Sequence, residues 1–194
     1  MRFLFLMLLF VLASCQPNEE ITSKTVDMYN TDGDMVGTAE LTEQPDGVEV
    51  KLTLEGLTPG FHGAHIHEFP ICEGPDFQSA GNHLDPEGNE HGLMHPDGAH
   101  LGDLPNVEAD DGGLVDAELM LAGATLTDGK NSILTGEGTS LVITEGQDDG
   151  VSQPAGDSGA RVLCGEIKSG KQDESTESPE SPTDPTDTNE DQGK

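Results

Sequence analysis

Basic residues are scarce in this sequence. Its 194 residues include 8 Lys and Arg against 38 Asp and Glu, which gives a formal net charge of −30 at pH 7. Nucleic acids and anionic bilayers are bound through basic surfaces, so we expect no nucleic-acid partner. Tryptophan is absent, and apolar residues make up only 32% of the chain. Because this apolar content is low for a compact fold, we expect part of the chain to lie outside the fold.

A hydrophobic run long enough to span a bilayer is also missing. The N-terminal apolar run, residues 3–13 behind Arg2, is far shorter than the roughly 20 residues that a spanning helix needs. A short apolar run with a basic start predicts a secretory signal peptide over residues 1–14.

A lipid anchor is expected directly after this run. Leu12-Ala-Ser-Cys15 resembles the lipobox of bacterial lipoproteins, in which the cysteine is lipidated and becomes the mature N-terminus. We therefore expect an extracytoplasmic protein that is lipid-anchored to the bacterial cell membrane through Cys15, with residues 15–23 as its tether. The alternative is ordinary cleavage near Ser14, which leaves Cys15 as a free thiol.

The C-terminal residues 169–194 contain no Val, Ile, Leu, Met or aromatic residue. Eight acidic residues stand against Lys171 and Lys194 there, a net charge of −6. Since nothing offsets the entropy cost of ordering such a segment, we predict an acidic disordered tail. The foldable domain is then expected over residues 24–168.

Short stretches of alternating apolar and polar residues fill the middle of the chain. Turn signals such as Pro45-Asp-Gly47 separate them, and no segment of useful length shows the 3.6-residue period of an amphipathic helix. The pattern predicts an all-β protein, an antiparallel β-sandwich or barrel. The alternating stretches are residues 36–41, 48–54, 114–120 and 141–143.

All seven histidines lie between His62 and His100, and residues 69–104 show no strand pattern. An irregular segment of that length inside a domain needs something other than a core to hold it. His65 and His67 are two residues apart on a predicted strand, so both rings point to one face and can reach one ion. Imidazoles with a carboxylate suit zinc, which would pin this loop. The further candidate ligands are His83, His91, His100 and Asp103.

Two cysteines remain once Cys15 is assigned to a lipid. Cys72 and Cys164 would form a disulfide in an exported protein, where disulfides persist; two free thiols are the alternative. The bridge would close a loop of about 92 residues and constrain the unfolded chain by roughly 4–5 kcal/mol. It would also tie the irregular loop to the last strand.

These residues stand in motifs that resemble those of the copper–zinc superoxide dismutase family, in particular its exported bacterial lipoproteins. The resemblance runs from about Thr25 to Ile167, and the spacing matches without a gap from His83 to Asp103. It implies a Greek-key β-sandwich and the disproportionation of superoxide to oxygen and hydrogen peroxide. The motifs are Gly60-Phe-His-Gly-Ala-His-Ile-His-Glu68, Gly81-Asn-His-Leu-Asp-Pro86, His91-Gly92, His100-Leu-Gly-Asp-Leu-Pro-Asn106 and Gly159-Ala-Arg-Val-Leu-Cys-Gly165.

The resemblance also implies a role for individual residues, with His83 bridging the two metals. Asp148 matches the acid that hydrogen-bonds one ligand of each metal. Arg161 matches the catalytic guanidinium that attracts and orients superoxide beside copper. The family's bacterial members differ in oligomeric state, so a homodimer stays open. The implied ligands are His65, His67 and His83 for copper, and His83, His91, His100 and Asp103 for zinc.

One position departs from the family pattern. The family's fourth copper ligand is a histidine that follows an apolar strand and precedes a glutamate, and this chain has Thr144 there. No histidine follows His100, so a shifted alignment cannot restore the ligand. Copper(II) favours a tetragonal set of four ligands, so we expect weakened copper(II) binding and a bias towards copper(I). A water, His95 or His62 could supply the position; otherwise the copper site is defunct.

Two functional classes follow from these patterns. The first is a lipid-anchored superoxide dismutase with superoxide as its substrate, and the second is a non-enzymatic zinc-binding or copper(I)-binding protein on the same fold. Residues 21–167 carry 28 acidic side chains against 4 basic ones, a net charge of −24, and Gly146 and Gln147 stand where the family often has lysine. We expect repulsion of an anionic substrate at low salt, screened beyond about 8–10 Å at physiological ionic strength.

Overall fold

The computed structural model describes residues 22–96, 98–127 and 129–170. The expected signal peptide at 1–14, Cys15 with nearly all of its tether, and nearly all of the tail at 169–194 lie outside the described residues. No helix in the described part of the chain has the length and apolar character needed to cross a membrane.

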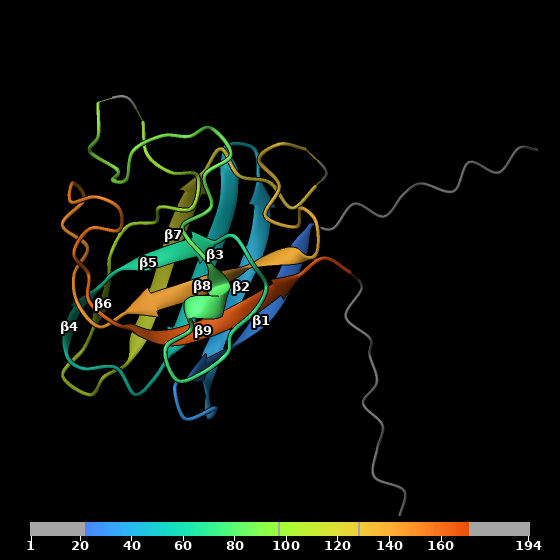
Figure 1. Ribbon diagram of the computed structural model, residues 1–194. Coiled ribbons are helices and arrows are strands. Elements are labelled where there is room, and N and C mark those ends of the chain that lie inside the picture. The colour runs from blue at the N-terminus through green and yellow to red at the C-terminus, as the bar shows by residue number, and fades with distance from the viewer. Residues whose placement is uncertain (1–21, 97, 128, 171–194) are drawn as a thin grey trace, which may run out of the picture.

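The described residues form an all-β protein of antiparallel strands (Figure 1). Within them, seven strands make one curled sheet in the order β5-β8-β9-β1-β2-β3-β7, and β4 pairs with β6. A single short 3-10 turn, η1, interrupts the irregular connections of the described chain. The elements are β1 (Ser23–Asn30), β2 (Met35–Gln44), β3 (Gly47–Leu54), β4 (Gly60–His62), β5 (Ala64–His67), η1 (Gln78–Ala80), β6 (Val107–Ala109), β7 (Val115–Ala122), β8 (Gly138–Thr144) and β9 (Arg161–Lys168).

The alternation seen in the sequence places one side of each long strand in the core. Leu41 of β2, Leu52 of β3 and Leu121 of β7 are fully buried, whereas their sequence neighbours face outward. Strand β8 differs, because all of its residues are buried. Its second face is covered by the loop that contains η1, where Phe77 packs with Val142 (Figure 1).

The long irregular segment is attached to the sheet at several points. Cys72 and Cys164 form the predicted disulfide, with a Cα–Cα distance of 5.7 Å, which ties the segment to β9. The Ile66 carbonyl of β5 accepts a hydrogen bond from the Leu84 amide, and the Ile66 amide donates to the Gly102 carbonyl, both at 2.8 Å. The prediction of an all-β antiparallel fold with a disulfide-tied loop is therefore confirmed.

Candidate metal centre

Strand β5 brings the candidate ligands together. His65 and His67 project from it to one side, and single β-bridges join His65 to Asp103 and His67 to His83. Two ligands from the irregular segment are thus fixed to a strand, although that segment contributes no strand of its own between His67 and Val107 in the described chain. His65, His67, His83 and Asp103 are all buried.

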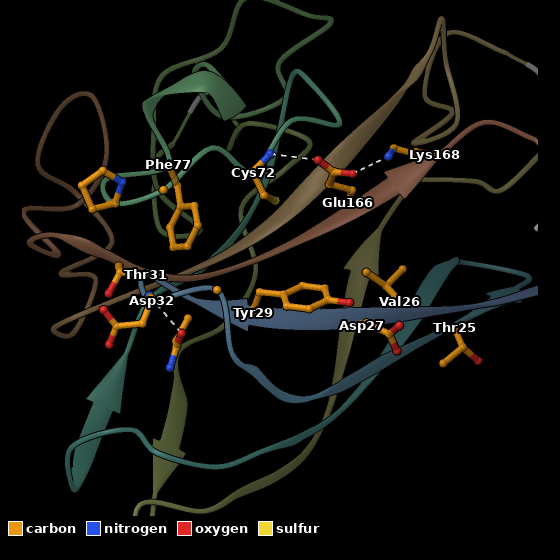
Figure 2. Close-up of a pocket in the computed structure, with 14 residues that line it drawn as sticks. Thr25, Val26, Asp27, Tyr29, Thr31, Asp32, Cys72, Phe77, Glu166 and Lys168 are labelled. Atoms are coloured by element: carbon orange, nitrogen blue, oxygen red, sulfur yellow. Dashed lines mark hydrogen bonds and ion pairs between the residues drawn. The ribbon is translucent and has the colours of Figure 1, made fainter. Parts of the chain in front are cut away.

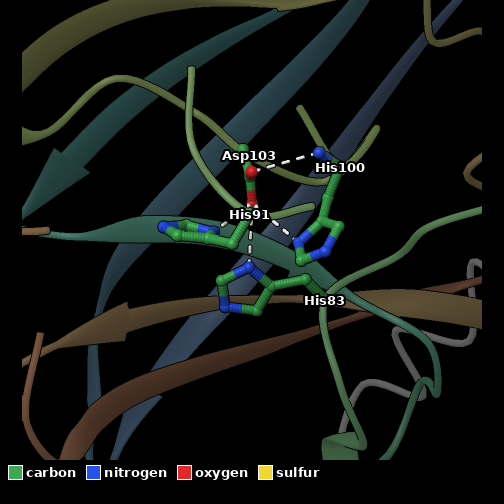
Figure 3. A group of neighbouring side chains, drawn as sticks. All are labelled: His83, His91, His100 and Asp103. Atoms are coloured by element: carbon green, nitrogen blue, oxygen red, sulfur yellow. Dashed lines mark hydrogen bonds and ion pairs between the residues drawn. The ribbon is translucent and has the colours of Figure 1, made fainter. Parts of the chain in front are cut away.

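Three histidines converge on one carboxylate oxygen (Figure 3). The Asp103 Oδ1 atom lies 2.8 Å from His83 Nδ1, 3.1 Å from His91 Nδ1 and 3.4 Å from His100 Nδ1. The other oxygen, Oδ2, accepts hydrogen bonds from the backbone amides of Gly92 at 2.8 Å and His100 at 3.1 Å. The backbone therefore orients Asp103 so that Oδ1 faces the three rings.

These distances match those between the ligands of a tetrahedral zinc ion. With metal–nitrogen bonds of 2.0–2.1 Å, the edge of the tetrahedron is about 3.3 Å. The Nδ1 atom of His100 is buried and makes no hydrogen bond within the described structure, as expected of a ligand atom that faces a metal. The residues His83, His91, His100 and Asp103 fit a structural zinc site.

A second group of nitrogen atoms adjoins the first and shares His83 with it. It contains His65, His67 and His83, all buried. The His67 Nδ1 atom donates to the Gly81 carbonyl at 3.0 Å, which leaves Nε2 of that ring free to bind a metal. The His65 Nε2 atom faces Asp148 Oδ2 at 2.7 Å, which leaves Nδ1 of that ring free to bind a metal. Both remaining atoms, His65 Nδ1 and His67 Nε2, are buried without a partner in the described structure. This set fits a copper ion.

The rings of His67 and His83 are neutral in the metal-free chain. Burial, reinforced by the neighbouring His83, lowers the pKa of His67 to about 2. Burial likewise lowers the pKa of His83 to about 4, although its hydrogen bond to Asp103 opposes the shift. Neutral imidazole is the form that binds metal, so both side chains are ready for a metal at neutral pH.

Asp148 connects the two groups through one carboxylate. Its Oδ2 atom lies 2.7 Å from His65 Nε2 and its Oδ1 atom lies 3.0 Å from His91 Nε2. Burial opposes ionisation, but the hydrogen bonds from His65 and His91 hold the pKa of Asp148 well below its usual range. The family resemblance implied this bridging role, and Asp148 lies within hydrogen-bonding distance of both rings.

Three residues without a predicted role support this bridge. The Asn106 side chain donates to the Asp148 carbonyl and accepts from the Asp148 amide, both at 2.8 Å. The Gln153 side chain makes the same double contact with the backbone of His91. Gly156 has a φ of +70°, and a Cβ there would lie 1.8 Å from Asp148 Oδ1. The Asn106 and Gln153 contacts join residues 42 and 62 apart in the chain, so no local sequence pattern signals them.

Thr144 lies next to this site at the end of β8. Its side chain is buried, and its hydroxyl lies 3.3 Å from the Gly63 carbonyl and 3.2 Å from the Gly146 carbonyl. A Cβ built on Gly63 would meet Thr144 Oγ1 at 2.6 Å and His65 Cε1 at 2.9 Å, so the hydroxyl lies close to the His65 ring. The hydroxyl hydrogen is directed to a backbone carbonyl.

Neither alternative histidine belongs to the metal groups of the described chain. His62 is buried, and its two ring nitrogens face the backbone carbonyls of Thr144 at 2.8 Å and Thr58 at 2.7 Å. Both nitrogens are therefore occupied by structural contacts. His95 is half-buried and lies in none of the ligand groups formed by the described residues.

Arg161 begins β9 directly opposite Thr144 of β8, where the pairing register shifts. Its Nη1 atom donates to the Phe77 carbonyl and its Nη2 atom to the Gly81 carbonyl, each at 2.8 Å. Because Gly81 also accepts from His67, one carbonyl positions both the guanidinium and a candidate metal ligand. A positive charge is thus fixed beside the second group.

A separate groove of about 770 Å³ lies away from these residues (Figure 2). Thr25, Asp27 and Tyr29 of β1 line one side, and Glu166 of β9 and Cys72 of the disulfide line the other. None of the described residues that line it is a histidine, so this groove is not the metal centre.

The curled antiparallel sheet carries two adjoining ligand groups that share one histidine. This arrangement fits the class of proteins that hold two metal ions side by side. Comparison with known proteins agrees. Residues 35–167 match the copper/zinc superoxide dismutase (SODC) family. The chain is 45% identical to superoxide dismutase [Cu-Zn] 2 of Aquifex aeolicus over 144 residues, which cover 73% of this chain and 84% of that protein.

Two further relatives come from Bacillus subtilis and Brucella abortus. The superoxide dismutase-like protein YojM of B. subtilis is 39% identical over 145 residues, 73% of this chain and 74% of that protein. The solved structure of Cu/Zn superoxide dismutase from B. abortus matches with a TM-score of 0.64 and 33% identity, covering 75% of this chain and 99% of that chain. The chain belongs to the copper/zinc superoxide dismutase family.

Proposed function

We propose that this protein is a superoxide dismutase that acts at the outer surface of a bacterial cell, with a weakened copper site. The observation that carries the proposal is the pair of adjoining ligand groups that share His83. Nδ1 of His65 and Nε2 of His67 have no hydrogen-bond partner among the residues that the structure describes. Zinc is assigned to the group around Asp103 and copper to the group of three histidines.

In this proposal the chain's own residues bind and orient the substrate. A bound copper ion would supply the one-electron chemistry, oxidising one superoxide to oxygen and reducing the next to peroxide. Arg161 attracts the anion, and the Phe77 and Gly81 carbonyls keep its guanidinium in place. Because His83 Nδ1 faces Asp103, its Nε2 atom is left for the copper group and can carry a proton to the product.

The weakness of the copper site is assigned to Thr144. A neutral hydroxyl is a poor donor to copper, and here its hydrogen is directed to the Gly63 or Gly146 carbonyl. His62 cannot replace it without giving up a contact to the backbone carbonyl of Thr144 or Thr58. Three imidazoles then remain, a set that favours copper(I) over copper(II), so we propose that reoxidation is the slow half-reaction.

The same observation favours one alternative, a non-enzymatic protein that binds zinc alone or zinc with copper(I). A site that holds copper(I) without returning it to copper(II) would bind metal and not turn over. The 39% identity to a protein named superoxide dismutase-like is compatible with this alternative. The two functions differ in whether bound copper alternates between copper(I) and copper(II).

The proposed location rests on the sequence around Cys15. A lipid on Cys15 would tether the domain by residues 15–23. Expression in a bacterium with a labelled fatty acid should label the protein, and Cys15→Ser should abolish the label. Label retained by Cys15→Ser would contradict the anchor.

The function is tested by restoring the ligand. Thr144→His should raise copper(II) affinity at least tenfold over wild type and speed dismutation, whereas Thr144→Val, which only removes the hydroxyl, should stay close to wild type. Competition with a copper chelator and copper(II) EPR give the affinity and the ligand set. If wild type already binds one copper(II) as tightly as Thr144→His, the account of Thr144 is wrong.

A further inference from the structure

His91 differs from the other candidate zinc ligands in how its backbone is held. His83 and Asp103 are joined to β5 by β-bridges, and the His100 amide donates to Asp103. His91 stands midway along the irregular segment, where the described chain shows no backbone-to-backbone hydrogen bond to it. A fully buried residue needs partners for both its amide and its carbonyl.

The Gln153 carboxamide provides both partners. The His91 amide donates to Gln153 Oε1 at 2.8 Å, and Gln153 Nε2 donates to the His91 carbonyl at 2.9 Å. Both contacts are partly buried, although the side chain of Gln153 as a whole is exposed. One planar side chain thus takes the place of a neighbouring strand at this residue.

The segment that carries Gln153 reaches the same residue at a second point. Asp148 Oδ1 lies 3.0 Å from His91 Nε2, and Asn106 fixes the backbone of Asp148. The backbones also touch at Gly92, where a Cβ would lie 2.0 Å from the Gly150 carbonyl. The 148–156 segment therefore holds His91 by its ring and by its backbone.

We propose that Gln153 is a positioning residue for the zinc site: its carboxamide fixes the backbone of His91 so that Nδ1 points at Asp103 Oδ1. The distance between these two atoms is 3.1 Å. Without these two hydrogen bonds to Gln153, the His91 backbone can rotate and turn the ring away, and zinc would lose one ligand of four. The inference rests on the zinc site of the proposed function and is independent of copper and of dismutation.

Two substitutions separate the contacts that Gln153 makes. Gln153→Ala removes both hydrogen bonds to His91, together with the longer one from Gln153 Nε2 to the Val151 carbonyl at 3.3 Å. Gln153→Glu keeps an acceptor for the His91 amide and loses the donor to the His91 carbonyl. Partners of metal ligands typically change metal affinity by about 10- to 100-fold when removed. We expect Gln153→Ala to weaken zinc binding by about that factor and Gln153→Glu to lie between Gln153→Ala and wild type.

A matched control is available in the same connection. Gln147 is exposed and precedes Asp148 directly, and its side chain makes no hydrogen bond or ion pair within the described residues. Gln147→Ala should leave zinc affinity within twofold of wild type. Cobalt(II), bound in place of zinc, reports on ligand geometry, so Gln153→Ala should change the cobalt d–d spectrum and Gln147→Ala should not.

Zinc affinity of the purified full-length protein is measured by competition with a chromophoric chelator. If Gln153→Ala binds zinc within twofold of wild type and leaves the cobalt spectrum unchanged, the proposal is wrong, even if the variant is less stable to heat. A wild type that binds no zinc overturns both proposals. If wild type binds zinc tightly but does not dismutate superoxide, the proposed function fails, and the Gln153 result still decides this inference.

Discussion

At the scale of the residue, one carboxylate positions both candidate metal sites. Asp148 accepts from His65 and from His91 through its two oxygens. An asparagine has one acceptor oxygen, so Asp148→Asn cannot satisfy both rings. We expect zinc affinity to fall by about 10- to 100-fold and copper affinity to fall as well, as measured by chelator competition.

The control for this substitution is the adjacent carboxylate. Asp149 accepts from the amides of Val151 and Ser152 within its own turn. Asp149→Asn should therefore bind both metals as wild type does. Equal metal affinities for the Asp148→Asn and Asp149→Asn variants would show that the bridge is dispensable.

His91 predicts a pH dependence for zinc binding. Burial opposes its charged form, but hydrogen bonds to Asp103 and Asp148 outweigh burial and raise its pKa to about 9 in the metal-free chain. Zinc binds only the neutral ring, so below this pKa zinc must displace a proton, and affinity rises with pH until His91 is neutral. Titration calorimetry in several buffers should find about one proton released per zinc near neutral pH and none well above the raised pKa. Zinc binding without proton release near neutral pH would contradict this assignment.

At the scale of the element, the sequence predicted four of the strands from their apolar patterns. Residues 36–41, 48–54, 114–120 and 141–143 all lie within or largely within β2, β3, β7 and β8. β4 and β6 are three residues each, and their extended shape comes from pairing Phe61 with Glu108, a contact that no local pattern encodes. The structure therefore confirms the class of fold. It adds the short strands and also β1, a strand of 8 residues that none of the predicted stretches covers.

The candidate site divides in the same way. Histidine clustering and family motifs pointed to the residues that form the ligand groups, because the type of a residue determines whether it can bind a metal. Asn106, Gln153 and Gly156 act through geometry, by amide clamps and by the lack of a Cβ. An Asn, Gln or Gly has many uses, so residue type alone could not identify these roles.

The disulfide attaches to β9 the loop whose Phe77 carbonyl positions Arg161. Cys72 lies in the same loop as Phe77, whose carbonyl accepts from the guanidinium. Replacing both cysteines, Cys72→Ala with Cys164→Ala, should lower the free energy of unfolding by about 2–5 kcal/mol, measured by urea denaturation. Dismutation should fall by more than zinc binding, because the loop orients Arg161. Unchanged urea midpoints would contradict a stabilising role.

At the scale of the whole molecule, charge opposes the proposed substrate. Residues 21–167 have a net charge of −24, and Arg161 is the basic residue fixed beside the three-histidine group. Added salt screens long-range repulsion from the acidic surface more than it screens a partly buried guanidinium at contact distance. We expect kcat/KM for superoxide to rise or stay level as salt increases from low ionic strength. A steep fall with salt would show that attraction dominates capture.

The central claim is that this chain dismutates superoxide through the two groups that share His83. It is tested most directly by following superoxide decay in a stopped-flow instrument with protein loaded with zinc and copper. We predict catalytic decay that requires copper, disappears when only zinc is loaded, and is slower than that of Thr144→His. Decay no faster than the spontaneous reaction for both the copper- and zinc-loaded wild type and Thr144→His would contradict the claim.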